Sequence, residues 1–278
     1  MKKINRRSFL AAAGLTAAAL ALTACGGSAS STASSTASSA ASSEAASTSA
    51  AAELTTVEAG KLTMATNAAF PPYEMTTDAG EFEGIDIDTA KAIAEKLGLE
   101  LQIDDMDFDA ALLSVQQGKA DIVMAGVTVT DERKAVMDFS DSYATGIQSI
   151  IVPEGSDITS PDDLAGKKIG TQRGTTGYIY CSDDFGDDAV VAYDDGLTAV
   201  QALNNGQVDA VVIDNAPAQE FIAANPGLAI LDTSYAEEDY AIGLAKGSAL
   251  EDAINAALEE LKADGTLQSI VDKYITAE

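Results

Sequence analysis

The sequence contains no histidine, and this absence excludes several kinds of active site. Ser-His-Asp and Cys-His catalysis both need an imidazole, and so do the commonest zinc sites. Cysteine is almost as scarce, because Cys25 and Cys181 are the only thiols. If Cys25 is lipidated, as argued below, no disulfide can form within the chain. We therefore expect no catalytic residue, no metal site and no cofactor.

Basic residues are also few. Sixteen Lys and Arg face 44 Asp and Glu, which gives a formal net charge of −28 at pH 7. Four of the basic residues lie within the first seven positions, so the remaining chain has 12 basic and 44 acidic residues and a net charge of −32. So negative a protein is repelled by phosphate backbones and by anionic lipid headgroups. We expect neither nucleic acid nor an anionic membrane surface as a partner.

The first 24 residues have the pattern of a bacterial export signal. A basic start precedes an apolar run over residues 9–24, which is too short for a comfortable membrane span. The run ends in Leu-Thr-Ala-Cys, which resembles the lipobox of bacterial lipoproteins, where a thiolate attacks the lipid donor. We predict a lipoprotein signal peptide over 1–24 and lipidation at Cys25, hence an exported protein anchored by lipid to the outer face of the cell membrane. An ordinary signal peptide that contains a cysteine is the alternative, and residues 5–10 also resemble a twin-arginine signal.

Residues 26–52 are almost entirely Ser, Ala and Thr. Such a tract buries too little apolar surface to offset the entropy of ordering it. We predict a disordered tether over 25–57, with a typical span of about 30 Å. It either holds the folded part near the membrane or serves as a plain spacer.

Beyond the tether, strand and helix patterns alternate. Gly98 and Gly118 mark helix ends. We expect helices over 86–97, 108–117, 132–137, 174–180, 196–204, 217–224, 250–262 and 266–274. We expect strands over 62–65, 99–103, 120–125, 147–152, 168–170, 190–193, 208–213, 228–231 and 241–244. This order predicts an α/β fold of parallel sheets flanked by helices.

Polar motifs follow four of the predicted strands. They occupy residues 67–73, 126–133, 171–177 and 214–215. In open parallel sheets, ligands bind outside the carboxyl ends of the strands. We therefore expect the four motifs to form one pocket.

The chemistry of these motifs is that of two opposite charges. Arg133 offers a planar fork suited to a carboxylate, and the helix start at Thr175 and Thr176 also favours an anion. Asp214 offers a negative charge, and Phe70 and Phe108 can supply apolar walls. A ligand that carries both a carboxylate and an ammonium satisfies the set, as the α-carbon end of an amino acid does.

Each residue also has a simpler interpretation. Arg133 can be a surface residue paired with Asp131 or Asp138. Residues 174–177 can be a plain helix entry, and Asp214 can cap the next helix. Phe70 and Phe108 can be core residues and Asn67 can make a local turn.

Several motifs together resemble the polar amino-acid binding proteins of ABC importers, solute-binding protein family 3. They are Phe-Pro-Pro-Tyr-Glu at 70–74, Gly-Ile-Asp-Ile-Asp at 84–88, Gly-Val-Thr-Val-Thr-Asp-Glu-Arg at 126–133, Phe-Ser-Asp at 139–141, Gly-Thr-Thr-Gly at 174–177 and Asp-Ala-Val at 209–211, followed by Asp214. The resemblance covers nearly all of residues 60–275.

The resemblance implies a two-lobe periplasmic-binding-protein fold of type II. The first lobe would comprise 58–146 and 237–278, and the second 147–236, with hinge crossings near 143–147 and 236–240. It also implies the partners: a free amino acid, held by a monomeric receptor, and the membrane permease of an ABC importer.

Site roles also follow from the resemblance. Arg133, with main-chain amides of Thr128 and of Thr175 or Thr176, would hold the α-carboxylate. Asp214 and the Gly126 carbonyl would hold the α-ammonium. Phe70 and Phe108 would enclose the ligand side chain, and Asn67 and Gln172 would face its tip.

The sequence departs from the family at Asn67. Relatives that bind basic amino acids often carry an acid there, so a neutral amide favours a neutral polar ligand, although Glu74 and other acids lie near the predicted pocket. Two other functions stay open. One is a ligand-sensing lipoprotein without a transport role, and the other is a dehydratase-type enzyme on the same fold, which would need a positioned acid or base such as Glu74 or Asp214.

Overall fold

The computed structural model describes residues 54–275. The predicted signal peptide, the predicted lipidation site Cys25 and most of the predicted tether lie outside these residues. The predicted tether reaches residue 57, whereas Leu54 packs against the hydrophobic core and the Val57 N–H donates to Asp121 Oδ1 at 2.7 Å. The folded part therefore includes residues 54–57.

The first sheet has five strands in the order β5-β1-β6-β14-β7. β1 is parallel to β5 and β6, whereas β14 runs antiparallel to β6 and β7. Because successive side chains of a strand point to opposite faces, Leu62 and Met64 join one apolar cluster and Ala65 joins another. The strands are β1 (Lys61–Thr66), β5 (Glu100–Asp105), β6 (Ile122–Val123), β7 (Met137–Phe139) and β14 (Gly243–Ala245).

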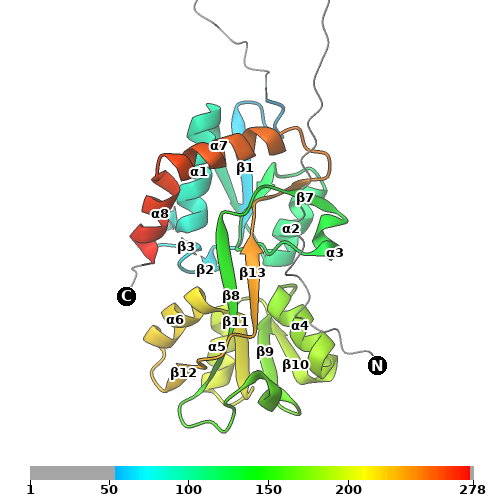
Figure 1. The fold of residues 1–278 in the computed structure, drawn as a ribbon, viewed down its shortest axis with the longest axis vertical. Helices are drawn as coiled ribbons and strands as arrows, with labels where there is room; N and C mark the ends of the chain where they lie inside the picture. Colours follow the sequence, from blue (N-terminus) through cyan, green and yellow to red (C-terminus); the bar gives the residue numbers. More distant parts are fainter. Residues whose placement is uncertain (1–53, 276–278) are drawn as a thin grey trace, which may run out of the picture. The chain divides into compact units, whose positions relative to one another are not determined.

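Helices cover both faces of this sheet (Figure 1). Apolar residues of α1, α7 and α8 pack in the cluster that contains Leu62, and those of α2 pack with Ala65. Gly98 ends α1 in the left-handed region at φ 69°, and its N–H donates to the last carbonyls of the helix. The helices are α1 (Ile85–Leu97), α2 (Phe108–Gln116), α3 (Asp131–Lys134), α7 (Glu251–Ala263) and α8 (Thr266–Tyr274).

The second sheet has the order β10-β9-β11-β8-β12, and β13 also pairs with β8. Here β9 is parallel to β10 and β11, and β8 is antiparallel to β11, β12 and β13. The strands are β8 (Ala144–Pro153), β9 (Ile169–Gln172), β10 (Val190–Tyr193), β11 (Ala210–Asp214), β12 (Leu228–Ile230) and β13 (Ala236–Tyr240). The helices are α4 (Thr176–Phe185), α5 (Gly196–Asn204) and α6 (Asn215–Ala224), with short 3₁₀ turns η1 (Pro161–Leu164) and η2 (Asp187–Ala189).

A small third sheet follows β1 and brings two pocket residues together. It consists of β2 (Ala69–Phe70), β3 (Glu74–Thr76) and β4 (Phe82–Glu83), all antiparallel. Phe70 and Glu74 are paired across the first hairpin. Both side chains are thereby held beside the carboxyl end of β1.

Two strands connect the sheets, and they form one antiparallel ribbon (Figure 1). In β8 and β13, Ala144 pairs with Tyr240 and Gln148 pairs with Ala236. The two predicted crossings, 143–147 and 236–240, lie on this ribbon. The structure therefore has the two lobes and two crossings that the sequence predicts; the lobe boundaries stay a prediction.

The structure differs from the prediction at several elements. The short strands β2, β3 and β4 were not predicted. Both sheets are mixed, because antiparallel strands flank their parallel parts. The predicted helix over 132–137 ends at Lys134, and Met137 begins β7 instead. β13 was not among the predicted strands. β7 and β13 are short and form by pairing with distant segments, which local periodicity does not reveal.

A substitution at Gly146 tests how closely the ribbon packs against the ring of Tyr240. A Cβ at Gly146 would collide with the buried ring of Tyr240, 2.7 Å from its Cε1 atom. We expect Gly146→Ala to lower the free energy of unfolding by about 1–3 kcal/mol through overpacking. Urea denaturation measures this change. The exposed neighbour in the same strand provides the control, because Thr145→Ala should stay within about 0.5 kcal/mol of the wild type. Equal stability of both variants would show that Tyr240 can move aside.

Candidate functional site

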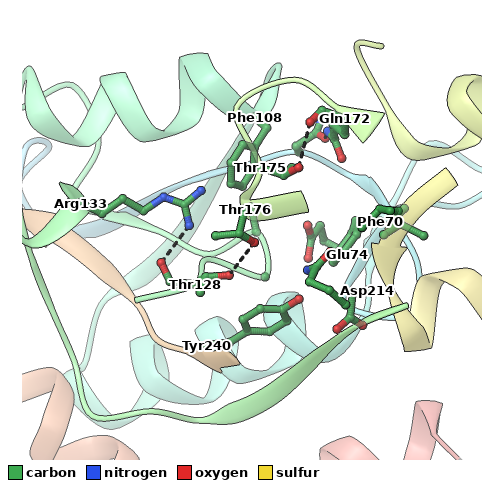
Figure 2. A pocket seen from close by; sticks show the side chains of 16 residues that line it. Phe70, Glu74, Phe108, Thr128, Arg133, Gln172, Thr175, Thr176, Asp214 and Tyr240 are labelled. Carbon is green, nitrogen blue, oxygen red and sulfur yellow. Dashed lines mark hydrogen bonds between the residues drawn. The ribbon is translucent and has the colours of Figure 1, made fainter. Parts of the chain in front are cut away.

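One pocket lies where the ends of the two sheets meet, and its lining includes all ten residues predicted to bind a ligand (Figure 2). The space between the lining atoms, counted with the mouth, is about 440 Å³. The ten are Asn67, Phe70, Phe108, Gly126, Thr128, Arg133, Gln172, Thr175, Thr176 and Asp214, and the other six are Glu74, Ala125, Gln148, Val212, Ile213 and Tyr240.

Arg133 is a buried pocket residue rather than a surface residue. The Thr130 hydroxyl caps the short helix α3 by accepting from the Arg133 N–H at 3.1 Å. The residue is 8% exposed; its Nη1 atom donates to Thr128 O at 2.8 Å and its Nη2 atom to Gly174 O at 3.2 Å. It also lies 5.4 Å from the centre of the Phe108 ring. Hydrogen bonds and a ring contact therefore fix its direction.

The acids near Arg133 in the sequence do not neutralise it. Asp131 and Glu132 are exposed, and Asp138 forms an ion pair with Lys246. Within residues 54–275, none of the ion pairs involves Arg133. Burial lowers the pKa of Arg133, and the negative charge of Glu238 opposes that shift. A buried guanidinium without an ion-pair partner is suited to an external carboxylate.

The amino end of α4 faces the same part of the pocket. Thr175 caps the helix, because its hydroxyl accepts from the Tyr178 N–H at 3.3 Å and donates to Gln172 O at 2.8 Å. The Thr175 N–H already donates to Gln172 O at 3.4 Å. Of the two predicted amides, Thr176 is therefore better placed to meet an anion at this helix end.

Asp214 lies on the other side of the pocket, where it lines the cavity and also caps a helix, while its role toward an ammonium stays a prediction. It ends β11 and caps α6, where Oδ1 accepts from the Ala216 N–H at 3.0 Å. Oδ2 accepts from the Ile147 N–H at 2.7 Å, so the carboxylate also contacts the strand that crosses between the lobes. Its exposure is 2%, and burial raises its pKa to about 6.

Beside Asp214 lies a second group of buried acids that the sequence did not assign. Gly126 has φ +54°, and a Cβ there would lie 2.8 Å from the Phe70 ring, so only glycine fits. Its N–H donates to Asp86 Oδ2 at 3.0 Å. Glu74 lines the pocket, is fully buried, and its carboxyl group lies beside that of Asp86. Burial raises the pKa of Asp86 to about 6, and burial together with the Asp86 charge raises the pKa of Glu74 well above its usual value.

Aromatic side chains form part of the pocket wall. Phe108 packs on Arg133, and Phe70 stacks on Tyr73 with ring centres 5.7 Å apart. Tyr73 in turn meets the edge of Tyr240 at 5.4 Å. These rings are buried, so Phe70 and Phe108 are core residues and pocket walls at once.

Asn67 and Gln172 join the two lobes. Asn67 Oδ1 accepts from Gln172 Nε2 at 2.8 Å, and Asn67 Nδ2 donates to Met106 O at 3.0 Å. Gln172 Nε2 is also 3.2 Å from Asp194 O. The Asn67 amide therefore bonds to the protein through both its oxygen and its nitrogen.

The six lining residues outside the prediction differ in how they could have been found. Ala125, Val212 and Ile213 are buried apolar residues beside predicted motifs, and Glu74 is within one of the motifs. Gln148 and Tyr240 come from the crossing ribbon, whose pairing no local pattern shows. Gln148 and Tyr240 could be assigned to the pocket only once the pairing of β8 with β13 was known.

Comparisons with known proteins agree on one family. The model of the bacterial extracellular solute-binding proteins, family 3, matches residues 62–277. A protein of Neisseria gonorrhoeae named as a probable histidine-binding protein is 32% identical over 99% of this chain and 98% of its own.

Solved structures of arginine-binding proteins are similar throughout the folded part. An ancestral arginine-binding protein bound to glutamine has a TM-score of 0.75 and 43% identity, covering 78% of this chain and 99% of its own. The arginine-, lysine-, histidine-binding protein ArtJ of Geobacillus stearothermophilus has a TM-score of 0.75 and 34% identity, covering 78% and 96%.

Two kinds of feature are absent from residues 54–275. No cluster of three or more His, Cys, Asp or Glu side chains there could hold a metal ion. No helix in this part of the chain is both long enough and apolar enough to cross a membrane.

The buried acids predict an unusual dependence of stability on pH. Because the pKa values of Asp86 and Asp214 rise to about 6 in the folded state, the folded protein binds more protons than the unfolded chain between about pH 4 and 6. Acidification through this window therefore stabilises the fold, by roughly 1–3 kcal/mol per group. We expect the ligand-free protein to melt at a higher temperature at pH 5 than at pH 7.

A matched variant identifies the source of this effect. Asp86→Asn keeps an oxygen for the Gly126 N–H but removes the charge, so it should be more stable than the wild type at pH 7 and gain less on acidification. Melting curves from pH 4.5 to 7.5 measure both. Carboxylates whose pKa is lowered oppose the trend only below about pH 4; they are Asp138, Asp163 and Asp264. A melting temperature that falls steadily from pH 7 to pH 5 would contradict the assignment.

Proposed function

The chain belongs to the bacterial extracellular solute-binding proteins, family 3, and on this basis we propose that it binds a free amino acid between its two lobes and delivers it to the permease of an ABC importer. One observation carries the proposal: Arg133 is buried in the pocket, held in direction, and without an ion-pair partner in the described residues. An amino acid would supply the missing carboxylate.

The opposite charges of the pocket support the same ligand class. Figure 2 shows Arg133 and Asp214 on opposite sides of the pocket, and they belong to different lobes. The α-carboxylate would bind Arg133 and the amides of Thr128 and Thr176. The α-ammonium would bind Asp214 and the Gly126 carbonyl. A zwitterion then interacts better with a closed pocket than with an open one.

Contacts across the pocket define the closed arrangement. Asn67 of the first lobe bonds Gln172 of the second, and Arg133 of the first bonds Gly174 O of the second. A ligand that strengthens this arrangement shifts the population toward it. Periplasmic binding proteins are known to close about a hinge around their ligands, and we propose the same motion for this protein.

The proposal also covers the location of the protein in the cell, its oligomeric state and the absence of turnover. Members of the family are extracellular proteins, and we propose that this one is a monomeric lipoprotein attached through Cys25 to the outer face of the membrane. We also propose binding without turnover. The lobe boundaries at 146/147 and 236/237 belong to the same proposal.

The neutral polar side chain that Asn67 predicts has one further support. Burial and Asp86 raise the pKa of Glu74 well above its usual value, which favours a protonated, uncharged carboxyl beside the ligand. A neutral carboxyl can both donate a hydrogen bond to an amide and accept one from it.

A cationic side chain is the second candidate. Among the ion pairs of residues 54–275 none involves Glu74, and ionised Glu74 would bind a guanidinium or ammonium. Similar proteins are named for arginine, lysine and histidine. The charge of Glu74 in the complex therefore separates the two candidates.

The Arg133 role is tested by a thermal-shift screen of the full chain against the twenty amino acids, before and after partial unfolding to remove carried ligand. A ligand at a hundred times its Kd stabilises by about 2.7 kcal/mol. We expect Arg133→Ala to abolish the shift, because it removes the carboxylate fork.

Two variants control this experiment. Arg133→Lys keeps the charge without the fork and should bind about tenfold or more weakly. Arg173→Ala removes an exposed arginine whose nearest acid, Asp194, is 3.8 Å away, and should bind as the wild type does. Wild-type affinity in a folded Arg133→Ala variant would refute the proposal.

The Glu74 question is answered by Glu74→Gln, which imitates the protonated carboxyl. With a neutral ligand, the variant should bind L-glutamine within about threefold of the wild type. With a cationic ligand, it should lose about tenfold or more in affinity for L-arginine. Calorimetry in buffers of different ionisation enthalpy adds a second measurement, because binding of a cation to protonated Glu74 would release a proton.

A further inference from the structure

A buried carboxylate outside the pocket lining connects three segments that meet there. Glu238 lies in the middle of β13, opposite Gly146 of β8, and is 7% exposed. Its Oε2 atom accepts from the Thr128 hydroxyl at 3.0 Å, from Gln148 Nε2 at 3.0 Å and from the Thr176 hydroxyl at 2.9 Å. All three donors line the pocket.

The three donors come from different parts of the fold. Thr128 belongs to the first lobe and follows β6, and Thr176 begins α4 in the second lobe. Gln148 lies on the ribbon between them. The two hydroxyl oxygens are 3.4 Å apart, so they are in contact only because the lobes are together. One oxygen of Glu238 thus bonds to both lobes and to the hinge ribbon.

Glu238 also fixes the direction of both hydroxyl groups. An ionised carboxylate only accepts hydrogen bonds, so both hydroxyl hydrogens point toward Glu238. The Thr128 carbonyl, in turn, accepts from Arg133 Nη1 at 2.8 Å. The main chain at Thr128 and Thr176, which we propose to meet the ligand carboxylate, is therefore held from the side away from the ligand.

The other oxygen of Glu238 indicates that stability is not the reason for this arrangement. Oε1 is buried and has no hydrogen-bond partner within the described residues. A buried carboxylate with one unsatisfied oxygen is a weak source of stability, because hydrogen bonds offset only part of its desolvation. The hydrogen bonds of Oε2, by contrast, connect the first lobe, the second lobe and the ribbon.

We propose that Glu238 is a positioning residue that acts through Thr128 and Thr176 to set how the two lobes meet at the carboxylate end of the pocket. Its effect on lobe closure does not require the ligand. Its effect on amino-acid affinity rests on the proposed function.

The first test follows the lobes without ligand. Dyes are attached at Glu95→Cys on α1 and at Gln201→Cys on α5, and energy transfer between them reports closure of the lobes in the full chain. The substitution Cys25→Ser prevents labelling at residue 25, and Cys181 is buried. Glu238→Ala should shift the ratio of open to closed molecules about tenfold toward open, because it removes bonds to an ionised acceptor. Glu238→Gln keeps an acceptor oxygen and should stay within about threefold of the wild type. Glu237→Ala, exposed in the same strand, should match the wild type.

A double-mutant cycle separates positioning from a general structural effect. Thr128→Val with Thr176→Val removes both hydroxyl donors, so it should reproduce the shift of Glu238→Ala. Adding Glu238→Ala to that pair should then change the ratio little further. Additive shifts, or an unchanged ratio in Glu238→Ala, would overturn the proposal. If Glu238→Ala does not fold, Glu238→Gln and the threonine pair still decide it.

The second test measures affinity for L-arginine and L-glutamine by calorimetry. Whichever binds the wild type should bind Glu238→Ala about tenfold more weakly and Glu238→Gln within about threefold, and ligand-free Glu238→Gln should melt near the temperature of the wild type. Equal loss in both variants, together with lower melting temperatures, would indicate a structural role only and refute positioning. If neither amino acid binds the wild type, the choice of ligand fails while the energy-transfer result still decides the role of Glu238.

Discussion

The burial of one guanidinium governs the rest of this pocket. Arg133 is 8% exposed, and within residues 54–275 its guanidinium donates to two carbonyl oxygens, one from each lobe. Carbonyl groups orient a guanidinium but do not neutralise it. The positive charge of Arg133 is therefore balanced either by the more distant Glu238 or by a ligand. A site built in this way is most favourable when an external carboxylate completes it.

The acids of the pocket are under the opposite constraint, because their burial disfavours a negative charge. Asp214 keeps its two carboxylate oxygens bonded to main-chain N–H groups, which holds it in place while burial disfavours its charge. Glu74 and Asp86 are buried next to each other, and repulsion by Asp86 adds to burial in raising the pKa of Glu74. An ammonium group would relieve part of the same repulsion. The pocket therefore separates one positive end from one negative end, as a zwitterion requires.

Much of this site follows from sequence because its residues are local to strand ends. Parallel strands bring their carboxyl ends together, so motifs that are far apart in the chain could be assigned to one pocket from the sequence alone. The ribbon of β8 and β13 could not be found in this way. In β13 the buried positions hold Glu238 and Tyr240, and a buried glutamate gives the pattern of a polar, exposed segment. What remained unpredicted therefore depends on pairing between distant segments.

The simple and the functional interpretations of a residue often prove to be compatible. Asp214 caps a helix and lines the pocket, and Phe70 belongs to the core and to the pocket wall. The reason is physical, since a binding group must be held rigidly, and caps and core packing are the means by which a fold holds side chains. A carboxylate whose oxygens each accept one main-chain N–H still has lone pairs for a further donor. Structural bonds of this kind therefore make a residue more useful to a ligand, and finding such bonds does not argue against a binding role.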